Sequence, residues 1–311
     1  MARQPLPNKP GAERNLYTPD AIAELPVKAP TTLLEHLSAS MPQCKRTTVK
    51  NYLKHNQVMV NGEVTRQFDR NLMPGDEVKV NTSREFQVFG HSRVKIYYED
   101  DDIIVAYKGY GLLSVATERD MNKKKEATAY SILRDYLKRK DPRNKLYIVH
   151  RLDKATSGLM MFAKTQEAKE AMQHNWNNMV LERKYVAVVE GYMEENEGMV
   201  RSYLVENARH EVYSTDDPSK GKLAVTYYKT LARRNGYSLV ELSLETGRKN
   251  QIRVHMKDLG HPIAGDKRYG ARTSPIHRVA LHAQTLRFAH PITRKDMNFT
   301  SAIPAAFEKL V

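Results

Sequence analysis

The feature that most constrains the fold is a polar interruption between two apolar runs in residues 146–164. One run of strand length enters this segment and a second leaves it, whereas the charged and small residues between them cannot continue a buried strand. Asp153 therefore lies where a strand breaks. Loops at strand ends are places where a rigid sheet holds a side chain out towards a ligand. Asp153 is a candidate of this kind, or else an ordinary aspartate of a polar turn that pairs with Arg151 or Lys154.

A longer pattern surrounds Asp153. It reads His-Arg-Leu-Asp at 150–153, Thr-Ser-Gly-Leu at 156–159 and Ala-Lys at 163–164. These ten positions, in this order, resemble the signature of the RluA-type pseudouridine synthases. The resemblance implies that Asp153 is the catalytic aspartate of that motif. It also implies that Arg151 enters the space left by a base that is flipped out of its helix.

The length of the chain indicates how many domains it forms, and its net charge indicates which class of molecule it binds. Its 311 residues suffice for one large domain and a small one, and its formal net charge is +14. Lysine and arginine side chains that neutralise phosphates gain affinity by releasing counterions, so nucleic acid is the first candidate. An anionic membrane surface is the rival, but no apolar segment approaches the ~18 residues of a membrane span. We therefore favour a nucleic-acid partner over a membrane.

The number of cysteines indicates the kind of cellular compartment in which the protein works. Cys44 is the only cysteine, which excludes a disulfide within the chain and a thiolate zinc site. Residues 1–30 lack the apolar core of a secretory signal. We expect the protein to stay in a reducing compartment, the bacterial cytoplasm, and to be a monomer.

Composition divides the chain into an arm and two domains. Residues 1–30 are rich in proline, asparagine and charge, which predicts a flexible arm or a strap across the surface; a basic arm that touches RNA is the weaker alternative. Residues 31–90 predict a small domain, and residues 93–311 follow a short linker as the large, catalytic domain. We expect an α+β fold overall. The large domain should be a mixed, largely antiparallel sheet with flanking helices, preceded by a small α/β domain.

Two helices and a hairpin are expected in the small domain. Thr31 or Thr32 can cap a first helix with leucines on one face, and Thr47 can cap a second. The pair Asn61-Gly62 suits the positive backbone angles of a type I′ turn between two short strands. A last strand is expected at residues 77–80, after a Pro-Gly-Asp turn at residues 74–76.

This order of helices and hairpin resembles the αL RNA-binding motif, which occurs in a ribosomal small-subunit protein and is fused to several RNA-modifying enzymes. By that resemblance, four basic side chains of the second helix face phosphates: Lys45, Arg46, Lys50 and Lys54. The alternative is that these four charges form an ordinary solvated helix face.

Periodicity in the large domain predicts its elements. Strands are expected at residues 94–98, 103–107, 182–191, 224–231 and 237–244, and helices at 127–140 and 166–177. Trp176, near the end of the second helix, is more often a packing anchor than a base-stacking residue. A further helix should place Ile252, Met256 and Leu259 on one apolar face and end at Gly260.

Three more site residues follow from the family resemblance. Tyr185, the first large side chain of its strand, corresponds to the active-site tyrosine that stacks on the target base. Arg253 lies in the family's Gly-Arg-x-His-Gln-Ile-Arg element, beside the catalytic aspartate, and Leu281 corresponds to an apolar wall of the uridine pocket. From the residues alone, Tyr185 is a core or rim side chain and Arg253 an exposed helix arginine. The lysines at 123–125 are a solvated loop tip or a phosphate contact.

Neither a metal nor an organic cofactor is expected. The spacing of His255, His261 and Asp266 fits no common zinc or di-metal pattern. The Gly-x-Gly at 109–111 lacks the third glycine and the opening helix of a dinucleotide loop, and no Walker loop is found. Pseudouridine synthesis fits this absence, because it moves a base on its own ribose and consumes no carrier.

These observations predict an RNA pseudouridine synthase, with large-subunit ribosomal RNA favoured as substrate and transfer RNA as the alternative. An enclosed carboxylate stays ionised more readily beside a guanidinium, so we expect Asp153 and Arg253 to pair. A catalytically idle RNA-binding assembly factor would have lost Asp153, Tyr185 or Arg253, and all three are present. An RNA methyltransferase would need a glycine-rich methyl-donor loop, which we do not find.

Overall fold

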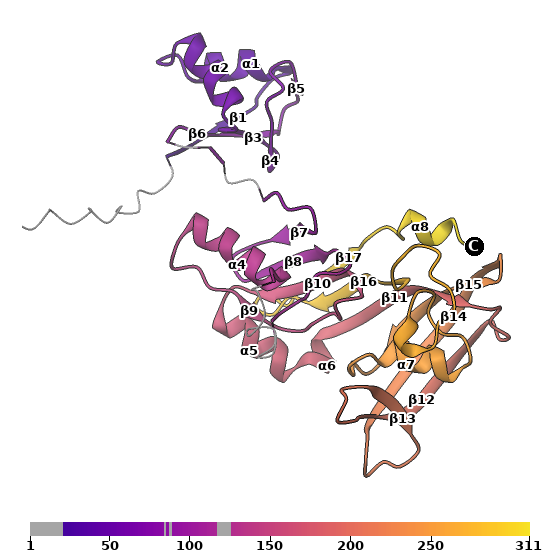
Figure 1. The fold of residues 1–311 in the computed structure, drawn as a ribbon. Coiled ribbons are helices and arrows are strands. Elements are labelled where there is room, and N and C mark those ends of the chain that lie inside the picture. The colour runs from indigo at the N-terminus through magenta and orange to yellow at the C-terminus, as the bar shows by residue number, and fades with distance from the viewer. Residues whose placement is uncertain (1–20, 84, 87–88, 117–125) are drawn as a thin grey trace, which may run out of the picture. The chain divides into compact units, whose positions relative to one another are not determined.

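The computed structural model describes residues 21–83, 85–86, 89–116 and 126–311. These residues form two compact units that divide between residues 88 and 89 (Figure 1). Each unit has its own hydrophobic core. Residues 1–20 of the expected arm and the expected basic tip at 123–125 lie outside the described residues.

The smaller unit combines two helices with short strands. Its elements are β1 (Ile22–Pro26), β2 (Thr31–Thr32), α1 (Leu33–Ser40), α2 (Arg46–Lys54), β3 (Val58–Val60), β4 (Glu63–Val64), β5 (Asn71–Leu72) and β6 (Glu77–Asn81). One antiparallel sheet has the order β1-β6-β3-β4, and β2 pairs with β5. Buried leucines and valines of both helices meet the valines of β3 and β6 in one core.

Two local signals determine where α1 begins and where the hairpin turns. Thr32 is the N-cap of α1, and its backbone N–H donates to Glu35 Oε2 at 3.3 Å. Asn61 and Gly62 have φ values of 51° and 82°, the two positive angles that a type I′ turn requires. Both features are confirmed predictions.

Two expectations for the smaller unit are wrong. Thr47 does not cap α2, because the helix begins at Arg46 after Lys45 as N-cap, and Thr47 lies inside its first turn. Residues 22–26 are not part of a flexible arm, because they form β1 and pair antiparallel with β6. This pairing satisfies backbone groups on the edge of β6, a long-range gain that local composition does not reveal.

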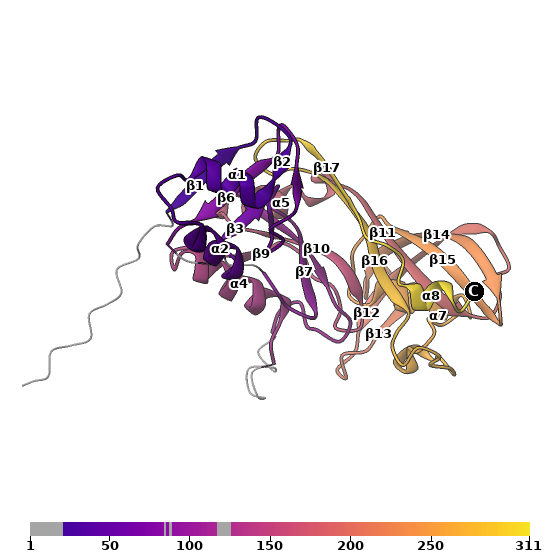
Figure 2. The same cartoon turned by 90° about the horizontal axis from the view of Figure 1, so that it is seen from above.

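The larger unit is built on one continuous sheet. Its strands are β7 (Val94–Glu99), β8 (Ile103–Lys108), β9 (Tyr147–Ile148), β10 (Ser157–Ala163), β11 (Val180–Glu190), β12 (Glu197–Glu206), β13 (Val212–Thr215), β14 (Lys222–Arg234), β15 (Tyr237–Leu244), β16 (Leu281–Ala289) and β17 (Asp296–Thr300). In the described residues the main path is β13-β12-β14-β15-β11-β16-β10-β8-β7, and β17 and β9 pair with β16 and β10 (Figures 1 and 2).

The pairing of these strands confirms the α+β class with a largely antiparallel sheet. Among the described strands only β10 and β16 pair in parallel. The long antiparallel strands β11, β14 and β15 carry a core of aliphatic side chains that also receives the helix after β15. The β7–β8 hairpin is confirmed as predicted.

Helices lie towards both ends of this sheet. They are α4 (Ala129–Lys140), α5 (Gln166–His174), α6 (Trp176–Met179), α7 (Gln251–Asp258) and α8 (Ala305–Glu308), with a short 3-10 turn at Lys267–Tyr269. Figures 1 and 2 show α4 and α5 near the β7–β10 end, whereas α7 contacts β13 and β14 near the other. None of the helices in the described residues has the length and apolar content that crossing a bilayer requires.

The structure corrects two details of the predicted helices. The helix expected at 166–177 is divided at Asn175 into α5 and α6, so Trp176 begins the second helix instead of lying near the end of the first. Leu259 follows the last residue of α7 and is 36% exposed, so it does not share the buried face of Ile252 and Met256.

Candidate active site

Asp153 lies in the loop between β9 and β10, and the residues on both sides of it are bound to the segment that follows β8. Ser114 Oγ donates to the carbonyl O of Leu152 at 2.7 Å and accepts from its N–H at 3.1 Å. The N–H of Gly111 donates to the carbonyl O of Lys154 at 2.9 Å. The backbone is therefore fixed immediately before and after the aspartate. Ser114 was not predicted as part of the site.

Gly158 allows β16 to approach the start of β10 closely. Its φ is +122°, and a Cβ there would lie 2.1 Å from the carbonyl O of Ala283. Ser157 and Gly158 pair in parallel with His282 and Ala283 across this contact. The glycine of the Thr-Ser-Gly-Leu motif thus brings Leu281, the first residue of β16, to the end of the aspartate loop.

A cavity of about 790 Å³ opens beside this loop. It is lined by all five residues of the larger unit that the sequence predicts for the site: Asp153, Tyr185, Arg253, Arg151 and Leu281. They come from four elements, the β9–β10 loop, β11, α7 and the start of β16. The volume is in the range of sites that enclose a small organic ligand.

Burial and four cationic side chains act in opposite directions on the pKa of Asp153. Asp153 is half-buried, and burial raises the pKa of its carboxyl above the ordinary value. Four cations lower this pKa, in decreasing order Arg253, Arg151, Lys108 and Lys249. These cations favour the ionised carboxylate, which is the form that can attack or support an electron-poor carbon.

The direct partner of Arg253 is Asp266. Arg253 Nε and Nη2 donate to the two carboxylate oxygens of Asp266 at 2.6 and 2.7 Å, and Nη1 donates to Asn250 Oδ1 at 2.9 Å. No hydrogen bond or ion pair joins Arg253 to Asp153 in the described part of the chain. The expected contact pair is therefore replaced by a longer-range interaction, in which a guanidinium oriented by Asp266 lowers the pKa of Asp153.

Neighbouring side chains hold the guanidinium of Arg253 in one orientation. Its side chain and that of Asp266 are 9% and 1% exposed. The Tyr269 ring lies 4.7 Å from the guanidinium carbon, and Asn250 Nδ2 donates to the Tyr269 hydroxyl at 2.9 Å. Burial lowers the pKa of Arg253, but the hydrogen bonds and charge of Asp266 outweigh it and raise that pKa. The role of Asp266 as this partner was not predicted.

Tyr185 and Leu281 supply uncharged parts of the cavity wall. Burial raises the pKa of Tyr185 to about 12, with a smaller raising effect from Asp153, so its phenol stays neutral. Leu281 is buried. A neutral ring and an aliphatic side chain can hold a base by stacking and packing.

Lys108, the last residue of β8, is a fully buried cation behind the aspartate loop. Its Nζ donates to the carbonyl O of Leu112 at 2.8 Å and of Gly109 at 3.1 Å. Burial lowers the pKa of Lys108 to about 7, while the charge of Asp153 raises it. These bonds fix the loop that carries the Gly-x-Gly at 109–111, so the lysine acts on the shape of the site as well as on its charge.

Trp176 and Arg183 also line the cavity, although neither was predicted there. The Trp176 ring lies 5.1 Å from the His150 ring and 5.8 Å from the guanidinium carbon of Arg183. Trp176 packs, as predicted, and it also faces the cavity. One signal could have revealed Arg183: it precedes Tyr185 by two residues in a strand, so both side chains project from the same face.

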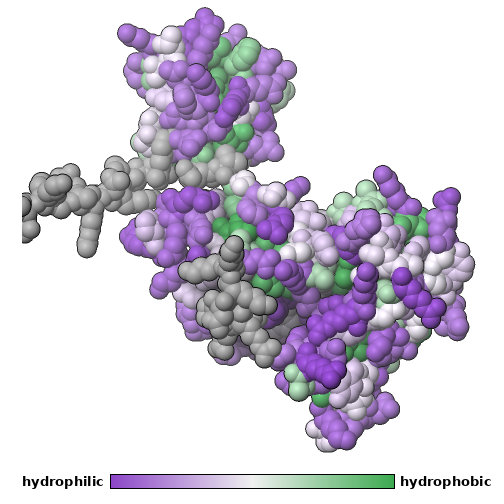
Figure 3. Space-filling model, viewed as in Figure 1, coloured by the Kyte–Doolittle hydropathy of each residue, from purple (hydrophilic) through white to green (hydrophobic). Residues whose placement is uncertain are grey.

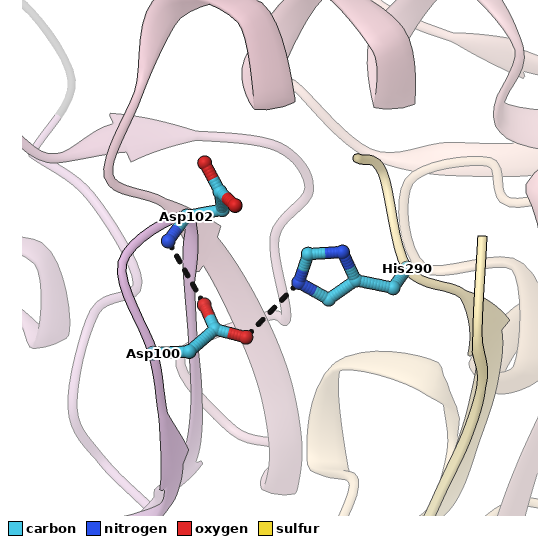
Figure 4. Close-up of side chains that lie close together, drawn as sticks. All are labelled: Asp100, Asp102 and His290. Atoms are coloured by element: carbon cyan, nitrogen blue, oxygen red, sulfur yellow. Dashed lines mark hydrogen bonds and ion pairs between the residues drawn. The ribbon is translucent and has the colours of Figure 1, made fainter. Parts of the chain in front are cut away.

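Outside the cavity, two aspartates and a histidine lie close enough together to resemble a metal site. Figure 4 shows them: Asp100, Asp102 and His290. Asp100 Oδ2 accepts from His290 Nε2 at 3.0 Å and from the Tyr98 hydroxyl at 2.8 Å, and Oδ1 accepts from the Asp102 N–H at 2.9 Å. His290 Nδ1 accepts from the Ile292 N–H, which makes Nε2 the donor. These bonds already engage the Asp100 carboxylate and both ring nitrogens of His290, and they tie the β7–β8 turn to the β16–β17 turn.

The three residues weighed as metal ligands have separate partners. His255 shares hydrogen bonds with two hydroxyl groups, His261 Nδ1 bonds with the carbonyl O of Glu190, and Asp266 binds Arg253. Each has a structural role of its own.

In the smaller unit, the four side chains expected to face RNA lie exposed on α2. We call this set the α2 basic face: Lys45, Arg46, Lys50 and Lys54. Val49 and Leu53 turn the other side of the helix into the core. None of the ion pairs found in the described residues involves this face. Hydrophilic residues cover most of the visible surface of the smaller unit in Figure 3.

Comparisons with known proteins find a matching family model and several relatives that match most of the chain. A family model described as RNA pseudouridylate synthase matches residues 102–258. The uncharacterized RNA pseudouridine synthase YlyB of Bacillus subtilis is 34% identical over 284 residues, which cover 88% of this chain and 91% of the relative. The ribosomal large subunit pseudouridine synthase D of Pasteurella multocida is 32% identical over 293 residues, which cover 88% of each chain.

A solved structure has the same fold. Human RNA pseudouridylate synthase domain containing 4 aligns with a TM-score of 0.55 at 24% identity, over 68% of this chain and 90% of that protein.

Proposed function

The chain belongs to the RNA pseudouridylate synthase family, and from this premise we propose that it isomerises uridines of structured large-subunit ribosomal RNA, with Asp153 as the catalytic residue. Membership makes it an isomerase that acts on RNA. Ribosomal RNA is favoured because curated relatives from several bacteria are named ribosomal large subunit pseudouridine synthase D.

The observation that carries the proposal is the setting of Asp153. Its carboxylate lies in a cavity, and four cations lower its pKa. The uncharged side chains of Tyr185 and Leu281 line the same cavity. In the reaction, the bond between the uracil nitrogen and ribose breaks, the base turns, and a carbon of the ring forms the new bond to ribose. That carbon loses its proton and the freed nitrogen holds one, so no oxidant or group donor is consumed. An ionised Asp153 can attack or electrostatically support the electron-poor centre that forms.

The remaining residues of the cavity suit a single extruded nucleotide. Flipping a base costs a few kcal/mol, which positive charge and an inserted side chain can offset. Arg151 is exposed and lines the cavity two residues before Asp153, a position from which it can occupy the vacated stack. Tyr185 would stack on the flipped uracil and Leu281 would pack on it.

The smaller unit would contribute affinity for structured RNA. Its two helices and hairpin follow the order of the αL motif, and the α2 basic face presents four exposed charges. Exposed cations of this kind bind phosphates and release counterions, with little regard to sequence. Recognition of the RNA would then be shared between this face and the cavity.

The proposal is tested by mapping pseudouridines in total RNA from cells with and without the protein. We expect one or a few positions in large-subunit ribosomal RNA to lose pseudouridine, and to regain it with the wild-type protein but not with the Asp153→Asn variant. Loss confined to transfer RNA would overturn the substrate, and an unchanged map would overturn the function.

A further inference from the structure

Arg183 is a charged side chain of the cavity that has no acidic partner. Its Nη2 donates to the carbonyl oxygens of Leu244 and Glu245, at 3.2 Å each. In the described residues no carboxylate forms an ion pair with Arg183, and neither its Nε nor its Nη1 has a hydrogen-bond partner. Two edges of a guanidinium that lines the cavity are therefore left for a ligand.

A comparison with Arg253 shows that Arg183 lacks a carboxylate partner in the part of the chain that the structure describes. Both arginines line the same cavity, and burial lowers the pKa of each guanidinium. Asp266 compensates the charge of Arg253 with two hydrogen bonds, whereas Arg183 is held only by carbonyl groups. A partly buried charge without a counter-charge is costly, and an anion supplied by the ligand would offset that cost.

The acids near Arg183 have other partners. Glu182 pairs with Lys184 at 3.0 Å, and the Glu245 carboxylate accepts from the Tyr227 hydroxyl at 3.0 Å. His150, also in this wall, is kept neutral, because burial and the charge of Arg183 lower its pKa to about 3. The charges of Glu182 and Lys184 thus offset each other, and Glu245 stays negative at the cavity edge without an ion pair to the Arg183 guanidinium, so Arg183 has no direct counter-charge among the described residues.

An aromatic ring lies next to this charge. The Trp176 ring is 5.8 Å from the guanidinium carbon of Arg183, and both side chains line the cavity. A guanidinium beside a flat ring is a suitable combination for a nucleotide, because the fork binds a phosphate and the ring offers a face to a base.

We propose that Arg183 binds a phosphodiester group of the RNA beside the target uridine, with Trp176 as the adjoining surface for a neighbouring base. This inference rests on the proposed function and adds a second contact point in the same cavity. Arg183 would then hold the backbone of the strand whose uridine has been extruded towards Asp153 and Tyr185. The effect belongs to substrate binding, since a phosphate outside the reacting bond has the same charge in the ground and transition states.

The test compares Arg183→Gln and Arg183→Lys with a charge-matched control. The control is Arg234→Gln, which removes an exposed arginine at the end of β14. The substrate is ribosomal RNA from cells that lack the protein, labelled with tritium at uridine C5, and tritium release gives kcat and KM between about 50 and 300 mM salt.

We expect Arg183→Gln to raise KM by roughly 10- to 100-fold, as loss of a charged hydrogen bond does. Its kcat should stay within about threefold of wild type, as for an interaction equal in ground and transition states. The slope of log KM against log salt should fall by about one for the lost phosphate contact. Arg183→Lys should retain the slope with a smaller rise in KM, and Arg234→Gln should change neither.

Two results would overturn the inference. An unchanged KM and salt slope in Arg183→Gln would exclude a phosphate contact. A fall in kcat at unchanged KM, with a melting temperature equal to wild type, would mean that Arg183 acts by positioning Tyr185 instead. Failure of the proposed function would look different, because the wild-type protein itself would then release no tritium.

Discussion

The cations of the two units lie in opposite surroundings. On the α2 basic face all four side chains are exposed, and no ion pair in the described residues involves them. In the larger unit, Arg253 is buried and bound by Asp266, and Lys108 is buried and donates to two backbone carbonyl groups. Both sets are positive, but water screens the first and hardly reaches the second.

We infer that this difference in exposure separates side chains that bind RNA from side chains that act on the reaction. Exposed charges interact with phosphates over several ångströms, tolerate rearrangement, and weaken as salt is added. Enclosed charges are fixed by their partners and act strongly on one nearby group, here the carboxyl of Asp153. We therefore expect variants of the α2 basic face to change affinity and salt dependence, and variants around Asp153 to change the rate.

Among the cations, the largest effect should come from Arg253, which is enclosed with its partner Asp266. Arg253→Met should lower kcat roughly 100- to 1000-fold, as loss of a preorganised charge beside a reacting centre does. It should also cost roughly 3–5 kcal/mol of unfolding free energy, because Asp266 is left buried without a partner. Tritium release and urea unfolding measure the two effects. Arg268→Met, an exposed arginine in the adjoining 3-10 turn, is the control.

A double variant separates the two effects of Arg253. Arg253→Met with Asp266→Leu removes both charges, so much of the lost stability should return while kcat stays low. Recovery of the rate together with stability would mean that Arg253 supports only the fold, and would remove it from the account of the chemistry.

An intermediate effect should come from the exposed face. Replacing all four residues of the α2 basic face with glutamine should raise KM roughly tenfold or more at moderate salt and leave kcat within about threefold of wild type. The slope of log KM against log salt should fall by about three to four, near one for each lost phosphate contact. A slope equal to that of wild type would contradict the role of the face in RNA binding.

The control for this variant removes the same four charges from exposed positions of the larger unit. These are Lys222, Lys229, Arg234 and Lys295. An equal change of slope in the control would mean that net charge alone, and not this face, determines the salt dependence.

The smallest effect should appear in the pH profile. Activity needs ionised Asp153, so kcat/KM should fall as the pH falls through a pKa that burial has raised. Lys249 lowers that pKa, and Lys249→Met should therefore move the acid limb to higher pH, by less than about one unit because Lys249 is the weakest of the four cations. Lys220→Met, which removes a lysine paired with Asp217, should leave the limb in place. A shift to lower pH would contradict the assigned sign.

Much of the fold and site could be predicted because the determining signals are local. Asn61 and Gly62 specify their turn by the backbone angles they tolerate, and Thr32 specifies the start of α1. Short stretches rich in apolar residues indicated β8, β11 and β15. The ordered motif around Asp153 indicated Asp153 and Arg151, and the wider family resemblance indicated Tyr185, Arg253 and Leu281, all of which line the cavity.

What could not be predicted depends on pairing across long distances in sequence. Residues 22–26 have too weak a pattern to predict a strand, and only the edge of β6 gives them a partner. Asp266 reaches Arg253 across 13 positions, and Ser114 reaches Leu152 across 38. Arg183 can be recognised as a candidate only from the structure, which shows that no carboxylate of the described residues pairs with it. Local sequence specifies neither the partner nor its absence.

The central claim is that Asp153 carries out the chemistry, while the α2 basic face and Arg183 contribute to RNA binding. Single-turnover tritium release with enzyme in excess over labelled ribosomal RNA tests it most directly, with Asp153→Asn against wild type and a filter-binding measurement on the same RNA. We predict that the variant binds within about threefold of wild type and releases tritium slower by roughly three orders of magnitude or more. Release by Asp153→Asn at the wild-type rate would contradict the account.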